Sequence, residues 1–238
     1  MYGYGYGYGY YGFDWTYVLL IIGMLLSLAA STRLKSTFSY YRRIRSASGL
    51  TGAETAERIL RAAGITDVHV RAISGSLTDH YDPRTKTVSL SEDIYDKTSL
   101  AAVGVAAHEC GHAIQHAIGY APLEFRSAIV PVANFGSTLS WPLFLIGFFS
   151  GIRPLVTAGI VLFSLAVLFQ LVTLPVEINA SSRALKMLQS TGILGSDETK
   201  GARKVLTAAA MTYVAALAAS ILQLLRLLIL AGGRRRDD

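Results

Sequence analysis

The chain has 238 residues, of which 52% are hydrophobic and only 16% are charged. Soluble domains carry about a quarter charged residues, so this composition argues against a soluble globular protein and indicates a membrane protein. The net charge of +6 does not indicate a nucleic-acid binder, because the Lys and Arg residues lie mostly beside apolar segments, where they orient a chain in a membrane. We therefore expect a lipid bilayer, and no nucleic acid, as a partner.

Residues 1–14 form a tail dominated by tyrosine and glycine that contains no lysine or arginine. Glycine disfavours a stable helix, so the tail is predicted to be disordered or to form a tyrosine cluster at the membrane interface. The uncharged run 15–32 follows. No basic segment precedes it, so it is predicted to be a transmembrane helix and not a cleaved signal peptide.

Region 33–126 is charged and holds twelve of the 22 Lys and Arg residues. By the positive-inside rule this region is cytoplasmic and the N-terminus lies outside. Within it, residues 50–64 and 98–119 have helical patterns, 67–73 alternate as a strand, and 77–91 have the pattern of a β-hairpin. These elements predict a small α+β domain on the cytoplasmic side.

Two further uncharged runs, 127–152 and 154–176, are separated by a short turn and predict a transmembrane hairpin over residues 127–176. A polar helix and a loop are expected over 177–204, with the helix ending near residue 190 and the loop near 200. A fourth hydrophobic helix is expected over 205–231. The fold class is therefore a mainly α membrane protein with about four transmembrane helices.

The charged tail at 232–238 does not fit this topology well. Four spans from an outside N-terminus place the tail outside, although Arg234, Arg235 and Arg236 favour the cytoplasm. A last helix that re-enters the membrane or lies along its surface is the alternative, and Gln223 and Arg226 within that helix are compatible with it.

The segment AHECGHAIQHA at 107–117 contains the pattern H-E-x-x-H. Residues four apart on a helix lie about 6 Å from each other, so His108 and His112 can bind one metal ion. Glu109 then lies beside the open coordination position, where a carboxylate can take a proton from a metal-bound water. Cys110 is expected to point away from both histidines and to serve as a small packing residue.

A catalytic site needs a third ligand. His116 lies about 12 Å along the helix from His108, too far to share one ion, so it is expected to be a neighbour of the site, a substrate-facing residue or an exposed polar residue. Glu177 is the first charge after the predicted hairpin, which returns the chain to the side of the histidine helix. Glu177 is therefore the predicted third ligand, and an ordinary acid at the membrane boundary is the alternative.

Three segments carry a resemblance to a known family: LTDHYDPRTKTVSLSEDIY, SLAAVGVAAHECGHAIQHAIGYAPLEFR and LPVEINASSRAL. They resemble the YugP-like membrane zinc metallopeptidases, relatives of the HtpX-type membrane proteases. The resemblance implies a zincin-like metallopeptidase domain, Zn²⁺ at His108, His112 and Glu177, and Glu109 as the catalytic base. In the HtpX-type relatives the third-ligand segment reads E-x-x-A-D. Here Ser181 replaces the aspartate, and Asn179 or Ser181 is the expected substitute.

The predicted function is a membrane-embedded zinc endopeptidase that hydrolyses membrane-associated or unfolded proteins, located in a prokaryotic plasma membrane with its active site in the cytoplasm. His80, His116 and Arg183 are the candidates for stabilising the oxyanion. Strand 85–91 is a candidate for pairing with an extended substrate. The competing hypothesis is a non-catalytic membrane scaffold with a structural or vestigial metal site. A transporter finds little support, because the apolar spans lack acidic and histidine residues.

Overall fold

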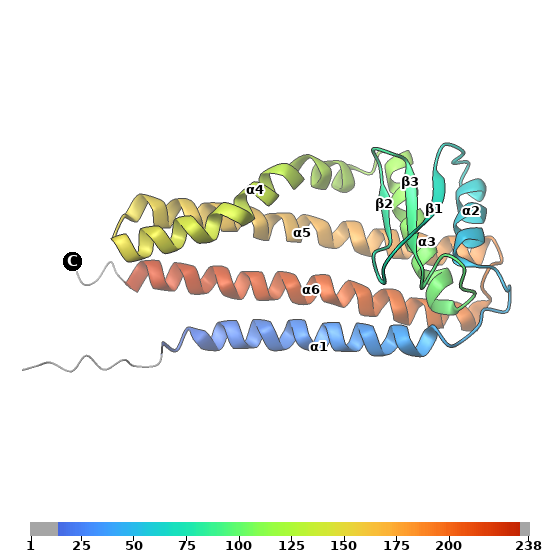
Figure 1. Cartoon of the computed structure of the whole chain (residues 1–238), viewed down its shortest axis with the longest axis horizontal. Helices are drawn as coiled ribbons and strands as arrows, with labels where there is room; N and C mark the ends of the chain where they lie inside the picture. Colours follow the sequence, from blue (N-terminus) through green and yellow to red (C-terminus); the bar gives the residue numbers. More distant parts are fainter. Residues whose placement is uncertain (1–13, 234–238) are drawn as a thin grey trace, which may run out of the picture.

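The computed structural model describes residues 14–233, so most of the tyrosine-glycine tail and the last residues of the charged tail lie outside the described part. Four long helices lie side by side along the length of the molecule, and two shorter helices and a small sheet gather at one end of them (Figure 1). In chain order the elements are α1 (Tyr17–Tyr41), α2 (Gly52–Ala62), β1 (His69–Ile73), β2 (His80–Asp82), β3 (Thr87–Ser91), α3 (Leu100–Ala117), α4 (Ala121–Ser150), α5 (Arg153–Ser190) and α6 (Ser196–Gly233).

The long helices α1, α4, α5 and α6 are each long and apolar enough to cross a membrane, so they are four candidate spans, in agreement with the number predicted. Their outward faces carry large, exposed apolar side chains such as Met24, Phe149 and Val161. Contact with lipid is more favourable than contact with water for such side chains. The helices alternate in direction, so the start of α1 and the end of α6 both lie at the end of the molecule opposite the sheet (Figure 1).

Several helices continue past the predicted ends of the apolar runs. Helix α1 extends nine residues beyond residue 32, and α4 already begins within the region expected to be soluble. Residues 177–190 continue α5 without a break, although Pro175 lies inside that helix. The loop expected to end near residue 200 is shorter than predicted, because α6 begins at Ser196. Composition shows where the membrane-spanning part of a helix ends. The helix itself continues for as long as its backbone hydrogen bonds and side-chain packing support it.

The three strands form one sheet in the order β1-β3-β2. Strand β3 pairs in parallel with β1 and antiparallel with β2, so that Val88 lies opposite both Val70 and Tyr81. The predicted hairpin is therefore present as β2 and β3. The expectation that strand 85–91 pairs with a substrate is wrong, because both edges of β3 are already hydrogen-bonded to neighbouring strands.

Helix α3 occupies the centre of this end of the molecule, packed against α2, α5, α6 and the sheet. Its buried face is built from small residues, chiefly alanine, which let the neighbouring helices approach closely. Helix α2 buries Ala56, Ile59 and Leu60 in the core, whereas Ala63 at its end is exposed. A capping box formed by Thr51 and Glu54 fixes the start of α2.

Candidate metal centre

The two histidines of the motif project from one side of α3. The Ser99 hydroxyl caps the helix by accepting a hydrogen bond from the Ala102 N–H at 3.2 Å, and the helix runs unbroken to Ala117. As a result the imidazole rings of His108 and His112 lie edge to face, with their centroids 4.8 Å apart. Two of the predicted ligands therefore lie next to each other on a rigid, largely buried helix.

Helix α5 brings Glu177 to these histidines because it packs unusually close to α3. A Cβ at Gly111 would lie 2.4 Å from the carbonyl oxygen of Ala180, so only glycine fits at this crossing. One turn before Ala180, the Oε2 atom of Glu177 lies 3.2 Å from Nε2 of His108 and 3.5 Å from Nε2 of His112. The carboxylate is almost completely buried.

The geometry of the three residues fits a zinc ion. One ligand atom from each of His108, His112 and Glu177 can be chosen so that all three lie within 4.8 Å of one another. Ligands about 2.1 Å from a tetrahedral zinc ion lie about 3.4 Å apart, which is close to the observed separations from Glu177. Two histidines and one carboxylate also form a catalytic zinc set, because they leave the fourth position open.

A second layer of hydrogen bonds orients the histidine rings. Nδ1 of His112 donates to the side-chain oxygen of Gln115 at 3.0 Å, and Nδ1 of His108 lies 3.1 Å from the Ser181 hydroxyl. The Gln115 amide group in turn donates to the Val176 carbonyl and to the side-chain oxygen of Asn179. These contacts leave the Nε2 atoms of both histidines beside the Glu177 carboxylate, as metal-binding histidines require.

Ser181 and Asn179, the two residues expected to substitute for the missing aspartate, thus contact different parts of the centre. Ser181 contacts His108 directly, whereas Asn179 reaches His112 only through Gln115. Gln115 itself was not predicted from the sequence. Its position three residues after His112 and its complete burial are the signals that could have identified it.

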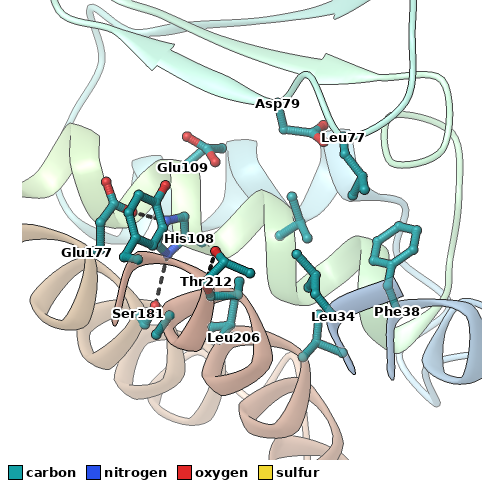
Figure 2. A pocket seen from close by; sticks show the side chains of 15 residues that line it. Leu34, Phe38, Leu77, Asp79, His108, Glu109, Glu177, Ser181, Leu206 and Thr212 are labelled. Carbon is teal, nitrogen blue, oxygen red and sulfur yellow. Dashed lines mark hydrogen bonds and ion pairs between the residues drawn. The ribbon is translucent and has the colours of Figure 1, made fainter. Parts of the chain in front are cut away.

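Glu109 lines the same cavity as His108, Glu177 and Ser181 (Figure 2). The cavity has a volume of about 190 Å³ and lies between α1, α3, α5, α6 and the loop that precedes β2. Its remaining walls are mostly apolar, from Leu34 and other aliphatic side chains. The arrangement places a carboxylate and an apolar recess beside the three candidate ligands.

The electrostatics of the centre favour a cation. Burial disfavours a charged imidazole at His112, but the hydrogen bond with Glu177 and the negative charges of Glu109 and Glu177 outweigh it and raise the pKa of His112. Two buried carboxylates thus create a position where positive charge is stabilised, as a divalent metal ion would provide.

Two polar residues that sequence reasoning missed also reach the centre. Nη1 of Arg126, in the first turns of α4, lies 3.5 Å from Oε1 of Glu177. Tyr213, on α6, lines the cavity together with Glu177. Arg126 looked like an ordinary charge at the start of a span, and Tyr213 like one tyrosine among many, so only the packing of the helices identifies them.

The three residues predicted as oxyanion candidates do not line the cavity. His116 Nδ1 lies 2.9 Å from the Tyr81 hydroxyl and joins α3 to β2. The exposed ring of His80 hydrogen-bonds to the Thr78 carbonyl. Arg183 donates to Asn179 and stacks over Tyr120.

Cys110 is buried and its thiol points away from the centre, toward the Ala56 carbonyl of α2 at 3.5 Å. Burial raises the pKa of this thiol and so favours its neutral form, as expected of a packing residue. The predicted packing role of Cys110 is confirmed.

Comparison with known proteins agrees with this geometry. The model of a family described as "Putative neutral zinc metallopeptidase" matches residues 16–232. The chain is also 49% identical over 220 residues to the "Putative membrane protease YugP" of Bacillus subtilis (strain 168), an alignment that covers 92% of this chain and 98% of that protein. No solved structure matches the chain. The matches confirm the resemblance seen in the sequence and, with the four apolar helices, indicate a multi-pass membrane protein.

Proposed function

Because the chain belongs to the neutral zinc metallopeptidase family, we propose that it is a membrane-embedded zinc endopeptidase that cleaves membrane-associated or unfolded proteins. The observation that carries the proposal is the convergence of His108, His112 and Glu177 beside a cavity that also contains Glu109. A structural zinc site has four protein ligands and no cavity at the ion, whereas this centre has three candidate ligands and an adjoining recess.

Each residue of the centre has a distinct role in this proposal. His108, His112 and Glu177 would hold a zinc ion, which would supply a Lewis acid for the scissile carbonyl and a water molecule of lowered pKa. The Glu109 carboxylate accepts the proton of that water and delivers it to the leaving amine. The Tyr213 hydroxyl, which shares the cavity, donates a hydrogen bond to the substrate carbonyl oxygen as negative charge develops there.

We propose that an extended substrate pairs with β2, and not with strand 85–91 as the sequence suggested. Strand β2 is at the edge of the sheet and contacts α3, which carries the histidines. One edge of β2 is hydrogen-bonded to β3, and the other has no strand partner among residues 14–233. Main-chain pairing at this edge accepts any sequence, which suits a protease for unfolded segments.

We place the centre at the cytoplasmic face of a prokaryotic plasma membrane. The end of α1 and the segment that follows it at the sheet end of the molecule carry five Lys and Arg residues between residues 33 and 45, whereas the tail before α1 has none. Lysine and arginine are retained on the cytoplasmic side during membrane insertion, which supports this orientation.

The test is proteolysis by the purified full chain and by two matched variants. Glu109→Gln should keep one equivalent of zinc but lose cleavage of casein and of an unfolded membrane protein by at least about a hundredfold, because the base is removed while the ligands remain. Glu124→Gln removes an exposed carboxylate outside the cavity and should cleave like the wild type.

The scaffold alternative predicts a different outcome. In that case zinc would be present, but the wild type and Glu124→Gln would both lack zinc-dependent cleavage, that is, cleavage that a chelator abolishes and added zinc restores. Undiminished cleavage by Glu109→Gln would contradict the assigned role of the glutamate.

A further inference from the structure

A second concave site lies away from the metal centre, on the outer side of the pair formed by α1 and α6. We call it the interfacial groove, and its volume is about 610 Å³. It is lined by Arg33, Ser36, Thr37, Tyr40 and Tyr41 from α1 and by Arg203, Lys204, Thr207, Ala208 and Met211 from α6. Neither the proposed catalysis nor the packing of the metal centre uses these side chains.

The groove presents three positive charges without a balancing carboxylate. Arg33, Arg203 and Lys204 are exposed, and no Asp or Glu is among the lining residues. None of the three forms an ion pair with the part of the chain that the structure describes. By contrast, Lys200, one turn earlier on α6, is paired with Asp197 at 2.7 Å. The groove therefore offers cations and hydroxyl donors to an anion supplied from outside the chain.

The groove lies where the apolar helices meet the polar end of the molecule. Arg33 directly follows the uncharged run 15–32, and Lys204 directly precedes the run 205–225. Below the cations, along α6, the lining becomes apolar with Ala208 and Met211. A ligand that fits this gradient has a negatively charged head and an apolar body.

We propose that the interfacial groove binds the phosphate of an anionic phospholipid, with the acyl chains lying against the apolar surface of α1 and α6. Basic pockets between transmembrane helices at the level of the headgroups bind such lipids through the same combination of charge and depth. The exposed Tyr40 ring supports this position, since tyrosine is enriched at the membrane interface.

The bound lipid would connect two helices that also form the wall of the metal cavity. Leu34 and Phe38 of α1, together with Leu206 of α6, line that cavity, while the neighbouring faces of the same turns line the groove. Lipid binding therefore holds α1 and α6 at the separation on which the cavity wall depends. This inference does not depend on proteolytic activity.

The proposal is tested by counting the lipids that stay bound to the purified full chain in native mass spectrometry. The chain is extracted from detergent micelles doped with phosphatidylglycerol or with phosphatidylcholine. The triple variant Arg33→Gln, Arg203→Gln, Lys204→Gln removes the groove cations. The control triple variant Lys35→Gln, Arg61→Gln, Lys186→Gln removes the same charge from exposed positions outside the groove.

The wild type and the control should retain phosphatidylglycerol in preference to phosphatidylcholine. The groove variant should bind phosphatidylglycerol about a hundredfold more weakly than the wild type, because each interfacial cation raises the affinity for an anionic lipid about fivefold. Equal loss in the two triple variants would overturn the proposal, as would equal retention of the two lipids by the wild type. Displacement of the lipid by millimolar inorganic phosphate would assign the groove to a soluble anion instead. Raising the salt concentration with the wild type gives a check that needs no variant, because it should release phosphatidylglycerol and leave phosphatidylcholine unaffected.

Discussion

The crossing of α3 and α5 at Gly111 gives the sharpest test of how the metal centre is assembled. A Cβ added by Gly111→Ala would lie 2.4 Å from the Ala180 carbonyl oxygen and 3.0 Å from the carbonyl carbon, both backbone atoms that cannot rotate away. Ordinary contact requires about 3.4 Å, so the helices must separate by about 1 Å. Overpacking of this kind costs about 1–3 kcal/mol of unfolding free energy.

The same displacement moves Glu177 away from the histidines, because the carboxylate is carried by the helix that is pushed back. Zinc affinity should fall about 10- to 100-fold, as when the supports of metal ligands are removed. The affinity is measured by competition with a chelator on the purified full chain, and stability by denaturant unfolding in detergent.

Gly104→Ala is the matched control on the same helix. Its added Cβ would meet the Ala202 side chain at 3.4 Å, an ordinary van der Waals contact. Alanine also favours helix over glycine by about 1 kcal/mol, so this variant should bind zinc normally and be at least as stable as the wild type. If Gly111→Ala matched Gly104→Ala in zinc affinity and stability, the close crossing would not be what positions Glu177.

Three further predictions concern the groups around the ligands. Gln115→Leu removes the acceptor that orients His112, and zinc affinity measured by chelator competition should fall about 10- to 100-fold. Zinc affinity should weaken as the pH falls through the pKa of His112, because only the neutral imidazole binds metal. The pKa of His112 is raised above its usual value, so an affinity that stays constant down to pH 5 would contradict this prediction. Tyr213→Phe should lower kcat about a hundredfold while leaving bound zinc unchanged, and a loss of zinc instead would make Tyr213 structural.

Those parts of the fold that depend on short stretches of sequence could be predicted. The four spans follow from the length of their apolar runs, and the helix with H-E-x-x-H follows from local pattern. The approach of Glu177 to the histidines follows from the fact that a transmembrane hairpin must return to the side it left. The assignment of these residues as zinc ligands stays a prediction that metal analysis must test.

The features that were missed depend on contacts between distant segments. Alternation along 67–73 and 77–91 predicts strands, but not that β3 lies between β1 and β2, because pairing partners are not encoded locally. Arg126 and Tyr213 are unremarkable in their own segments. Arg126 is identified only by its ion pair with Glu177 on α5, and Tyr213 only by the cavity that it lines together with Glu177. The continuity of α5 was obscured because Pro175 and the following charge resemble a helix end.

The order of the ligands along the chain has a consequence for biogenesis. His112 is synthesised 65 residues before Glu177, and the intervening α4–α5 hairpin must cross the membrane twice before the glutamate returns to the histidines. A chain that has been translated only as far as α4 therefore carries only two of the three candidate ligands. We therefore expect the proposed peptidase to acquire its metal, and with it its activity, only after the α4–α5 hairpin has inserted.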